Sequence, residues 1–194
     1  MLNKFFPEIS SNGSIGIQIV SSGPDVSGEQ IKRSMVKMLN SAKKSIYVQT
    51  PYLIPDMPFL EALQTASISG TDVYVMLPGV PDKWYVYYVT LSYMKELLDY
   101  GIRVFIYPGF LHSKMVVVDD EIVTIGSTNI DVRSFNLHFE VNGFIYDSTF
   151  AKKCADIFND DKAVSTEVRL EDYNRRKPFR IFVESILRLF APLM

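Results

Sequence analysis

The chain has 194 residues, of which 47% are hydrophobic and 22% charged, and its formal net charge at pH 7 is −2. This length suits a single domain, and the slightly acidic balance argues against a nucleic-acid partner, whose protein surface is usually basic. The single cysteine, Cys154, excludes an internal disulfide framework. No apolar run reaches the roughly 18 residues of a membrane-spanning helix, and the first residues lack the apolar core of a signal peptide, so the chain is expected to be soluble.

Strand and helix patterns alternate along the chain. Short β-rich runs predict strands over 14–22, 45–50, 72–78, 103–108 and 139–147. Apolar residues at helical spacing predict helices over 28–43, 57–69, 82–100 and 148–160. Ser27 and Gln30 have the spacing of a capping box for the first helix, and Asp56 and Gly70 bound the second. This order predicts an α/β fold, a three-layer α-β-α sandwich around a mixed sheet.

The predicted elements divide the chain into four segments. Residues 1–13 are interpreted as a leader or linker, and residues 14–160 as the α/β domain. A polar connection over 161–177 follows, and the chain ends in an amphipathic helix over 178–194. No internal repeat interrupts this order. The polar connection is the favoured place for a domain boundary.

The C-terminal segment has two interpretations. Its apolar face comprises Phe179, Phe182, Val183, Ile186, Leu187 and Phe190. Arg180, Glu184 and Arg188 lie opposite, and the basic run 175–177 precedes the helix. The favoured interpretation packs the apolar face on the sheet or on another part of the protein. The alternative is binding to an anionic lipid surface, which the basic run would assist.

The segment FLHSKMVVVDDEIVTIGSTN, residues 110–129, predicts a β-hairpin that carries polar side chains at one end. Three consecutive valines, 116–118, indicate a strand that is covered on both faces, and Asp119 and Asp120 supply the turn. The return strand brings Ser127 and Asn129 back toward His112 and Lys114. Hydrogen-bond donors and one fixed positive charge at one sheet edge suit a phosphate group. No acidic pair or His/Cys cluster accompanies them, so neither a metal nor another cofactor is expected.

These residues carry a resemblance to a known family. The pattern H-x-K-x₄-D-x₆-G-[ST]-x-N is complete in this chain, with the positions His112, Lys114, Asp119, Gly126, Ser127 and Asn129. It resembles the signature of the phospholipase D superfamily. The continuation NIDVRSFNLHFEVNGFIYD, together with TPYLIPD upstream, is similar to the second of the two catalytic halves of bacterial cardiolipin synthases. The resemblance extends over residues 14–194, and makes 14–160 a phospholipase D-like catalytic half-domain.

The resemblance implies a reaction and a role for each motif residue. In the family, two motifs form one active site that transfers a phosphatidyl group through a phosphohistidine, without a metal. The resemblance assigns the nucleophile to the first half, so His112 would act as the general acid and then as the general base. Lys114 and Asn129, with Ser127, would hold the phosphate oxygens. Glu140 is the expected hydrogen-bond acceptor for His112.

Asp119 completes the catalytic signature, although its position at the far end of the strand favours a turn or salt-bridge role. His138 is the only other histidine, and no lysine lies two residues after it. His138 is therefore expected to be structural. The aromatic residues at 84, 85, 87 and 88 are too many for one helix face, so some are expected in the core and a few at a lipid-facing rim.

The implied function is the conversion of two phosphatidylglycerol molecules into cardiolipin and glycerol, with this chain supplying one of two motifs. The implied partners are anionic phospholipid and the N-terminal catalytic half of the same protein, located at the cytoplasmic side of a bacterial cell membrane. Two alternatives stay open. One is a stand-alone phosphodiesterase or nuclease that forms a homodimer and pairs two His112 side chains. The other is a non-catalytic, membrane-associated binding module.

Overall fold

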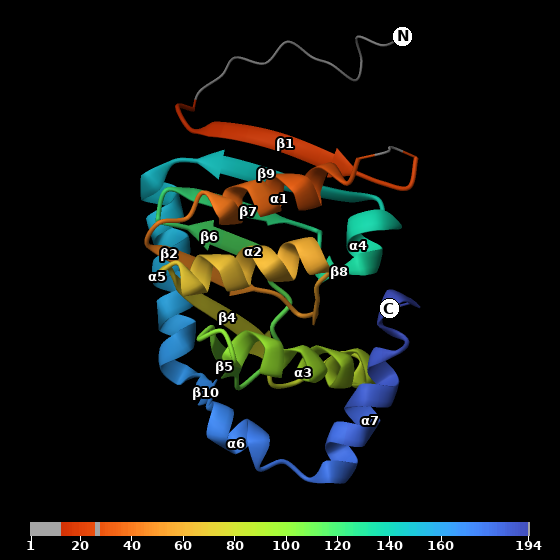
Figure 1. The fold of residues 1–194 in the computed structure, drawn as a ribbon. Helices are drawn as coiled ribbons and strands as arrows, with labels where there is room; N and C mark the ends of the chain where they lie inside the picture. Colours follow the sequence, from red (N-terminus) through yellow and green to blue (C-terminus); the bar gives the residue numbers. More distant parts are fainter. Residues whose placement is uncertain (1–12, 26–27, 194) are drawn as a thin grey trace.

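A computed structural model describes residues 13–25 and 28–193 of the chain. In this part of the chain an eight-stranded mixed sheet has the strand order β1-β9-β7-β6-β2-β4-β5-β10 (Figure 1). Strands β2, β4 and β5 are parallel, and the other pairs are antiparallel. The strands are β1 (Gly16–Ser22), β2 (Ser45–Gln49), β4 (Asp72–Pro78), β5 (Arg103–Tyr107), β6 (Met115–Val118), β7 (Ile122–Gly126), β9 (Glu140–Tyr146) and β10 (Thr166–Val168).

Helices cover both faces of this sheet, which confirms the predicted three-layer sandwich. Helices α1 (Gln30–Asn40), α2 (Met57–Ile68) and α3 (Trp84–Leu98) lie on one face, and α5 (Ser148–Val164) lies on the other (Figure 1). The valines of β6 show why both faces need a cover. Val116 and Val118 belong to the apolar core under α1–α3, whereas Val117 packs with Phe158 of α5. Successive strand residues point to opposite faces, so this unbroken apolar run fits a central strand.

Helix and strand boundaries follow the sequence closely where a local signal exists. Strand β4 has the predicted bounds. Helix α2 begins after Asp56, whose carboxylate accepts a hydrogen bond from the Phe59 amide at 3.2 Å. Gly70 follows the end of α2 with φ +93°, a conformation that glycine adopts without strain. For α1 the residue before the helix is Glu29, in the left-handed region. Ser27, the predicted capping residue, lies outside the described residues.

The sequence did not indicate several short elements. Strands β3 (Leu53–Ile54) and β8 (Ile130–Asp131) form a second, two-stranded parallel sheet, and α4 (Val132–Asn136) follows β8. The predicted polar connection over 161–177 is not an extended linker. It contains the end of α5, the edge strand β10 and helix α6 (Leu170–Asn174). The predicted leader over 1–13 falls, apart from Gly13, outside the described residues.

The chain ends in helix α7 (Pro178–Arg188) and a short 3₁₀ turn, η2 (Ala191–Leu193). Helix α7 packs against α3 (Figure 1). Across the described residues, no helix combines the length and the apolar character that a membrane crossing requires.

Asp119 fixes the turn between β6 and β7 to the start of β2. Both turn residues, Asp119 and Asp120, have φ of +57°. The Asp119 carboxylate accepts hydrogen bonds from the backbone amides of Lys43, Lys44 and Ser45 at 2.9, 2.7 and 2.9 Å. These contacts lie at the opposite end of β6 from His112. The contacts of the Asp119 carboxylate are therefore those of a residue that fixes a turn, and none of them reaches His112.

We expect Asp119→Ala to lower the free energy of unfolding by about 1–3 kcal/mol, because it leaves three backbone amides without their charged acceptor. Asp120→Ala is the matched control, since this residue has the same φ and its buried carboxylate oxygen has no hydrogen-bond partner within the described residues. Chemical denaturation of both variants measures the difference. Equal losses would attribute the effect to the left-handed backbone instead of the amide bonds.

Candidate active site

The hairpin brings the two ends of the signature together. Met115 pairs with Ile125 in the antiparallel β6–β7 ladder, and the Gly126 amide donates to the Lys114 carbonyl at 3.3 Å. The segment before β6 therefore lies beside the loop after β7, as the sequence predicted. One detail differs. Within the hairpin predicted over 110–129, strand β6 begins only at Met115, so His112 and Lys114 lie in the segment before it. The Lys114 ammonium turns back and donates to the His112 carbonyl at 2.9 Å.

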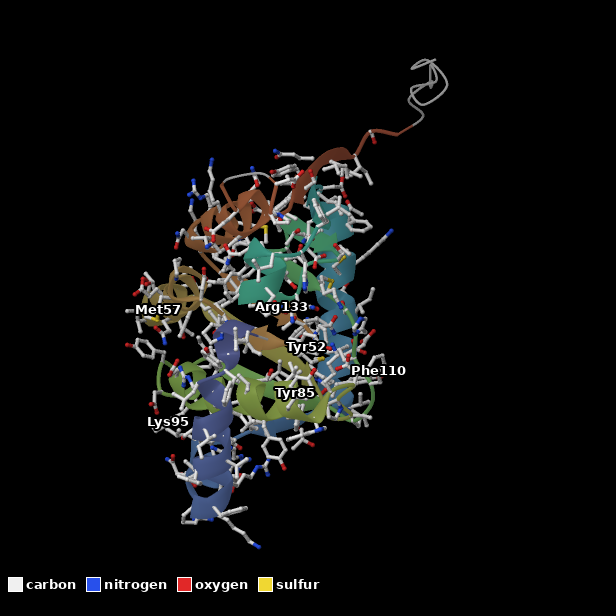
Figure 2. All side chains as sticks on the ribbon, turned by 90° about the vertical axis from the view of Figure 1, so that its right-hand side faces the viewer. Tyr52, Met57, Tyr85, Lys95, Phe110 and Arg133 are labelled. Atoms are coloured by element: carbon white, nitrogen blue, oxygen red, sulfur yellow. The ribbon has the colours of Figure 1, made fainter. Side chains whose placement is uncertain are left out.

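A cleft of about 370 Å³ opens beside His112 and Asn129. Figure 2 shows Tyr52, Tyr85 and Arg133 gathered on the face of the molecule where this cleft lies. The cleft is lined by Tyr52, Ile54, Asp82, Lys83, Tyr85, Val86, His112, Asn129, Asp131, Arg133, His138 and Leu193. The structure thus brings His112 and Asn129 to one cavity. Lys114 does not line the cleft. It lies close enough to interact electrostatically with Asp82 and Asp131, which do line it.

His112 is exposed, and its ring stacks on Phe110 with a centroid distance of 5.5 Å and an interplanar angle of 12°. No hydrogen bond joins this ring to another described residue. The stacking restricts the ring plane, and no described residue bonds to either ring nitrogen. An imidazole in this state can donate or accept a proton at a ligand.

Asn129 presents a carboxamide that the fold does not use. Its Oδ1 atom is buried and has no hydrogen-bond partner within the described residues. A buried polar atom without a partner is costly, so such an atom in a cleft marks a place where a ligand can complete the hydrogen bonding. The carboxamide offers both donor and acceptor capacity to a phosphate or a hydroxyl group.

Glu140 does not occupy the predicted place beside His112. Its carboxylate lies 3.7 Å from Nδ1 of His138, and its side chain is only 10% exposed. The predicted hydrogen bond from His112 to Glu140 is therefore absent from this structure, and His138 is the histidine that Glu140 contacts. His138 was expected to be structural, but it lies on the wall of the cleft, which the sequence did not indicate.

Carboxylates surround the single lysine of the motif. Burial lowers the pKa of Lys114, and the negative charges of Glu140, Asp82 and Asp131 raise it and offset part of that effect. Asp131 is itself buried and accepts a 2.6 Å hydrogen bond from the Ser134 amide at the start of α4. Burial raises the pKa of Asp131. Lys114 is thus a partly desolvated cation among acidic groups.

Tyr52 and Asp82 form a second polar pair on the cleft wall. The Tyr52 hydroxyl donates a short hydrogen bond to the Asp82 carboxylate. Burial, followed by this bond, raises the pKa of Tyr52 far above its ordinary value. The pair joins the loop after β2 to the start of α3, so nothing in the sequence placed the two residues together. The prolines around Tyr52 in TPYLIPD indicated only a loop.

Strand β9 holds the Gly-Ser-Thr-Asn loop through Asn142, a residue that the sequence analysis missed. Its fully buried carboxamide accepts from the Thr128 amide at 3.3 Å and donates to the Thr124 hydroxyl at 3.1 Å. The Ser127 hydroxyl accepts from the Val141 amide at 3.0 Å. The contacts of Ser127 in this structure are those of a residue that fixes the loop. The sequence did offer one signal for Asn142, because it is a polar residue inside an apolar strand.

Within the part of the chain that the structure describes, no group of three or more His, Cys, Asp and Glu side chains is placed to hold a metal ion. The groups at the cleft can instead exchange protons and donate hydrogen bonds. His112 supplies the exchangeable proton, and Asn129 and Lys114 supply donors. This set suits a reaction at an anionic phosphorus centre.

We predict that Gly126→Ala disrupts this loop, because a Cβ there would lie 2.2 Å from the Asn142 Oδ1 and 2.3 Å from the Val141 carbonyl oxygen. Such overpacking should cost about 1–3 kcal/mol of stability. Gly143→Ala in the adjoining strand is the control, since its Cβ would meet atoms no closer than 3.8 Å. Thermal unfolding of the two variants gives the comparison. A Gly126→Ala protein as stable as Gly143→Ala would contradict this account of the loop.

The chain matches known proteins over nearly its whole length. Residues 35–162 match the family model described as "Cardiolipin synthase, PLD-like domain". The chain is 49% identical over 193 residues to a cardiolipin synthase of Staphylococcus aureus strain Mu50, covering 99% of this chain and 39% of that protein. It is 50% identical over 190 residues to the major cardiolipin synthase of Bacillus subtilis, covering 97% of this chain and 39% of that protein. The chain thus spans about two fifths of these relatives.

Solved structures agree on the fold. The phospholipase D family member Nuc from Salmonella typhimurium has a TM-score of 0.65 at 21% identity, covering 80% of this chain and 99% of that chain. The phosphatidylserine synthase of Haemophilus influenzae has a TM-score of 0.71 at 16% identity, covering 95% of this chain and 47% of that chain. The family match covers most of the chain and includes the whole signature, from His112 to Asn129. The chain therefore belongs to the family of cardiolipin synthase, phospholipase D-like domains.

Proposed function

We propose that this chain supplies one half of the active site of a phosphatidyltransferase that converts two phosphatidylglycerol molecules into cardiolipin and glycerol. The observation that carries the proposal is the complete signature, with His112 and Asn129 on one cleft, in a chain half identical to named cardiolipin synthases. The chain covers 39% of those relatives, which leaves room in them for a second half. Only one copy of the signature occurs here.

The proposed reaction has two transfers at phosphorus. In the first, a histidine of the other half attacks phosphorus and forms a P–N bond, while the bond to the glycerol headgroup breaks. His112 gives its proton to the departing alkoxide. In the second, His112 takes the proton from a hydroxyl of the second phosphatidylglycerol, whose oxygen attacks phosphorus as the P–N bond breaks. The product is cardiolipin, and both histidines return to their initial state.

The other motif residues would stabilise charge. Lys114 and Asn129 are proposed to bind the non-bridging phosphate oxygens, where negative charge accumulates in each transition state. Glu140 is proposed to act through its neighbours, because it lies against His138 and its charge acts on Lys114. It would keep the ammonium protonated inside a partly desolvated site. In this proposal Glu140 is a positioning residue.

The second half is proposed to cover an apolar area of the sheet, which we call the uncovered sheet face. It lies on the α5 side of strands β1, β9 and β7, where Ile19 and Ile125 flank Gly143 in register. The exposed residues of this face are Ile17, Ile19, Ile125 and Val141. The backbone amide of Val141 donates a hydrogen bond to the Ser127 hydroxyl, so this face adjoins the signature loop. Exposed apolar patches of this kind are usually interaction surfaces.

The whole protein is proposed to act at the cytoplasmic side of a bacterial cell membrane, because both proposed substrates are membrane lipids. A homodimer that pairs two His112 side chains is the alternative assembly. The slightly acidic net charge of −2 supports a lipid substrate over a nucleic acid.

Glu140→Gln should lower the pKa of Lys114 further, because the Glu140 charge raises that pKa. In a two-half enzyme the same change should slow transfer about 10- to 100-fold. NMR titration of the Lys114 ammonium in this chain measures the first effect, and cardiolipin formation the second. Glu121→Gln is the control, because Glu121 is an exposed carboxylate at the far end of the hairpin. An unchanged Lys114 pKa would remove Glu140 from the site.

His112→Ala should reduce cardiolipin formation by at least about a thousandfold in the two-half protein, because the leaving alkoxide loses its acid. His138→Ala is the matched control on the same cleft, with a much smaller loss expected. This chain alone should form a dimer, or be a sluggish monomer, without enzymatic rates of cardiolipin synthesis. Full synthesis by a strictly monomeric preparation of the 194 residues would refute the two-half proposal.

A further inference from the structure

Helix α7 is turned with its charged side toward the protein. Glu184, in the middle of the helix, is 2% exposed. Its carboxylate accepts hydrogen bonds from Arg176 at 2.8 Å and from Arg180 at 3.2 Å. Arg188 pairs with Glu96 of α3 at 2.5 Å, and its guanidinium lies 4.1 Å from the ring centroid of Tyr93. A helix fixed in this way directs its other side outward.

The outward side of α7 is apolar. The exposed fractions are 77% for Phe179, 61% for Phe182, 41% for Ile186, 78% for Leu189 and 49% for Phe190. At about 100° per residue the first three fall within one arc of the helix, roughly opposite Glu184, and Leu189 and Phe190 follow directly after the helix end. We call this arc the outer face of α7. An amphipathic helix of a globular protein normally buries such an arc, and this arc is not packed on the sheet. Packing on another part of the protein, the other arm of the favoured interpretation, stays a prediction.

Small apolar contacts at the end of α7 hold this orientation. Leu187 and Ala191 pack in a cluster with Ile54, Val86 and Val89, between the loop after β2 and α3. The inward-facing apolar residues of α7 are thus few, and the larger aromatic ones stay outside. The arrangement needs an external apolar partner, because several exposed phenylalanines and leucines in and directly after one helix exceed the scattered exposure of ordinary surfaces.

We infer that the outer face of α7 binds the surface of an anionic lipid bilayer, with the helix lying in the membrane plane. Charge complementarity supports this occupant. Residues 175–194 carry five cations against the single carboxylate of Glu184, in a chain whose net charge is −2. Arg175 and Lys177, just before the helix, are exposed and form no ion pair with any described residue. Phenylalanine and leucine on one face with lysine and arginine beside them is the pattern of interfacial helices.

The outer face leads to the mouth of the cleft. Leu193 lines the cleft, and its carbonyl accepts a hydrogen bond from Arg133 at 3.4 Å. Figure 2 shows α7 rising across this side of the molecule toward Arg133, Tyr52 and Tyr85. Trp84 is 64% exposed and contacts Tyr85, which adds an aromatic ring suited to the lipid interface. A bilayer on the outer face would place lipid headgroups next to His112, a consequence that rests on the proposed function.

The second catalytic half is a less suitable occupant of this face. The uncovered sheet face lies on the α5 side of the sheet and adjoins the signature loop, whereas α7 packs on α3, on the other side. The two apolar areas are therefore available to two different partners. The basic run 175–177 also has no counterpart on the uncovered sheet face, whose members are aliphatic.

Co-sedimentation of this chain with vesicles of equal parts phosphatidylglycerol and phosphatidylcholine tests the inference. The double variant Phe182→Ser/Ile186→Ser should weaken binding at least about tenfold, because it removes two apolar anchors. Ile68→Ser/Val164→Ser is the control, since both residues are exposed on helices elsewhere, and it should bind as the parent chain does. Arg175→Gln/Lys177→Gln should weaken binding about tenfold or more at low salt. Vesicles of phosphatidylcholine alone should bind poorly.

Several results would overturn the inference: a parent chain that ignores phosphatidylglycerol vesicles, or equal binding by the outer-face and control variants. An outer-face variant that changes the oligomeric state and leaves vesicle binding intact would assign the face to another protein chain. Circular dichroism confirms that each variant is folded. A His112→Ala chain should still bind vesicles, because the outer face is unchanged. In the two-half protein, loss of transfer with vesicle binding retained concerns the proposed function alone, and loss of vesicle binding with transfer retained concerns α7 alone.

Discussion

The candidate site depends on the close contact between Gly126 and Asn142. The carboxamide of Asn142 is fully buried, and it can reach both Thr124 and the Thr128 amide only because residue 126 has no Cβ. A buried amide that satisfies both of its ends stabilises one backbone path and penalises others. That path carries the chain from β7 to Asn129 and into the cleft. The loop that presents Asn129 is therefore held by two neighbouring strands, β7 and β9.

Sequence analysis succeeded where the determining contacts are local. The hairpin register follows from its turn, and the valines of β6 predicted cover on both faces, which Val117 and Val118 confirm. It was less successful where an interaction joins distant segments. Glu140 and His138 are only two residues apart, yet the preference of Glu140 for His138 over His112 depends on how the segment before β6 folds. The Tyr52–Asp82 pair likewise requires α3 to lie beside the loop after β2.

Helix α7 shows a further limit of sequence patterns. Amphipathic spacing identifies two faces of a helix but not which one the protein covers. Here the buried carboxylate of Glu184 decides, since a buried charge is stable only with partners, and Arg176 and Arg180 supply them. Arg188 adds a contact to α3. Ion pairs thus fix the orientation of a helix whose aromatic residues would otherwise favour the core.

The charges around Lys114 give a physical reason for a second half. The electrostatic partners of this ammonium are three carboxylates, on Glu140, Asp82 and Asp131. The charge of the cleft itself is balanced, because its cations Lys83 and Arg133 stand beside Asp82 and Asp131. The positive charge of Lys114 is thus largely offset for a phosphodiester that enters the cleft of this chain alone. A second half that brought its own lysine and asparagine would add the missing positive charge and donors, so these charges suit a shared active site better than phosphate binding by this chain alone.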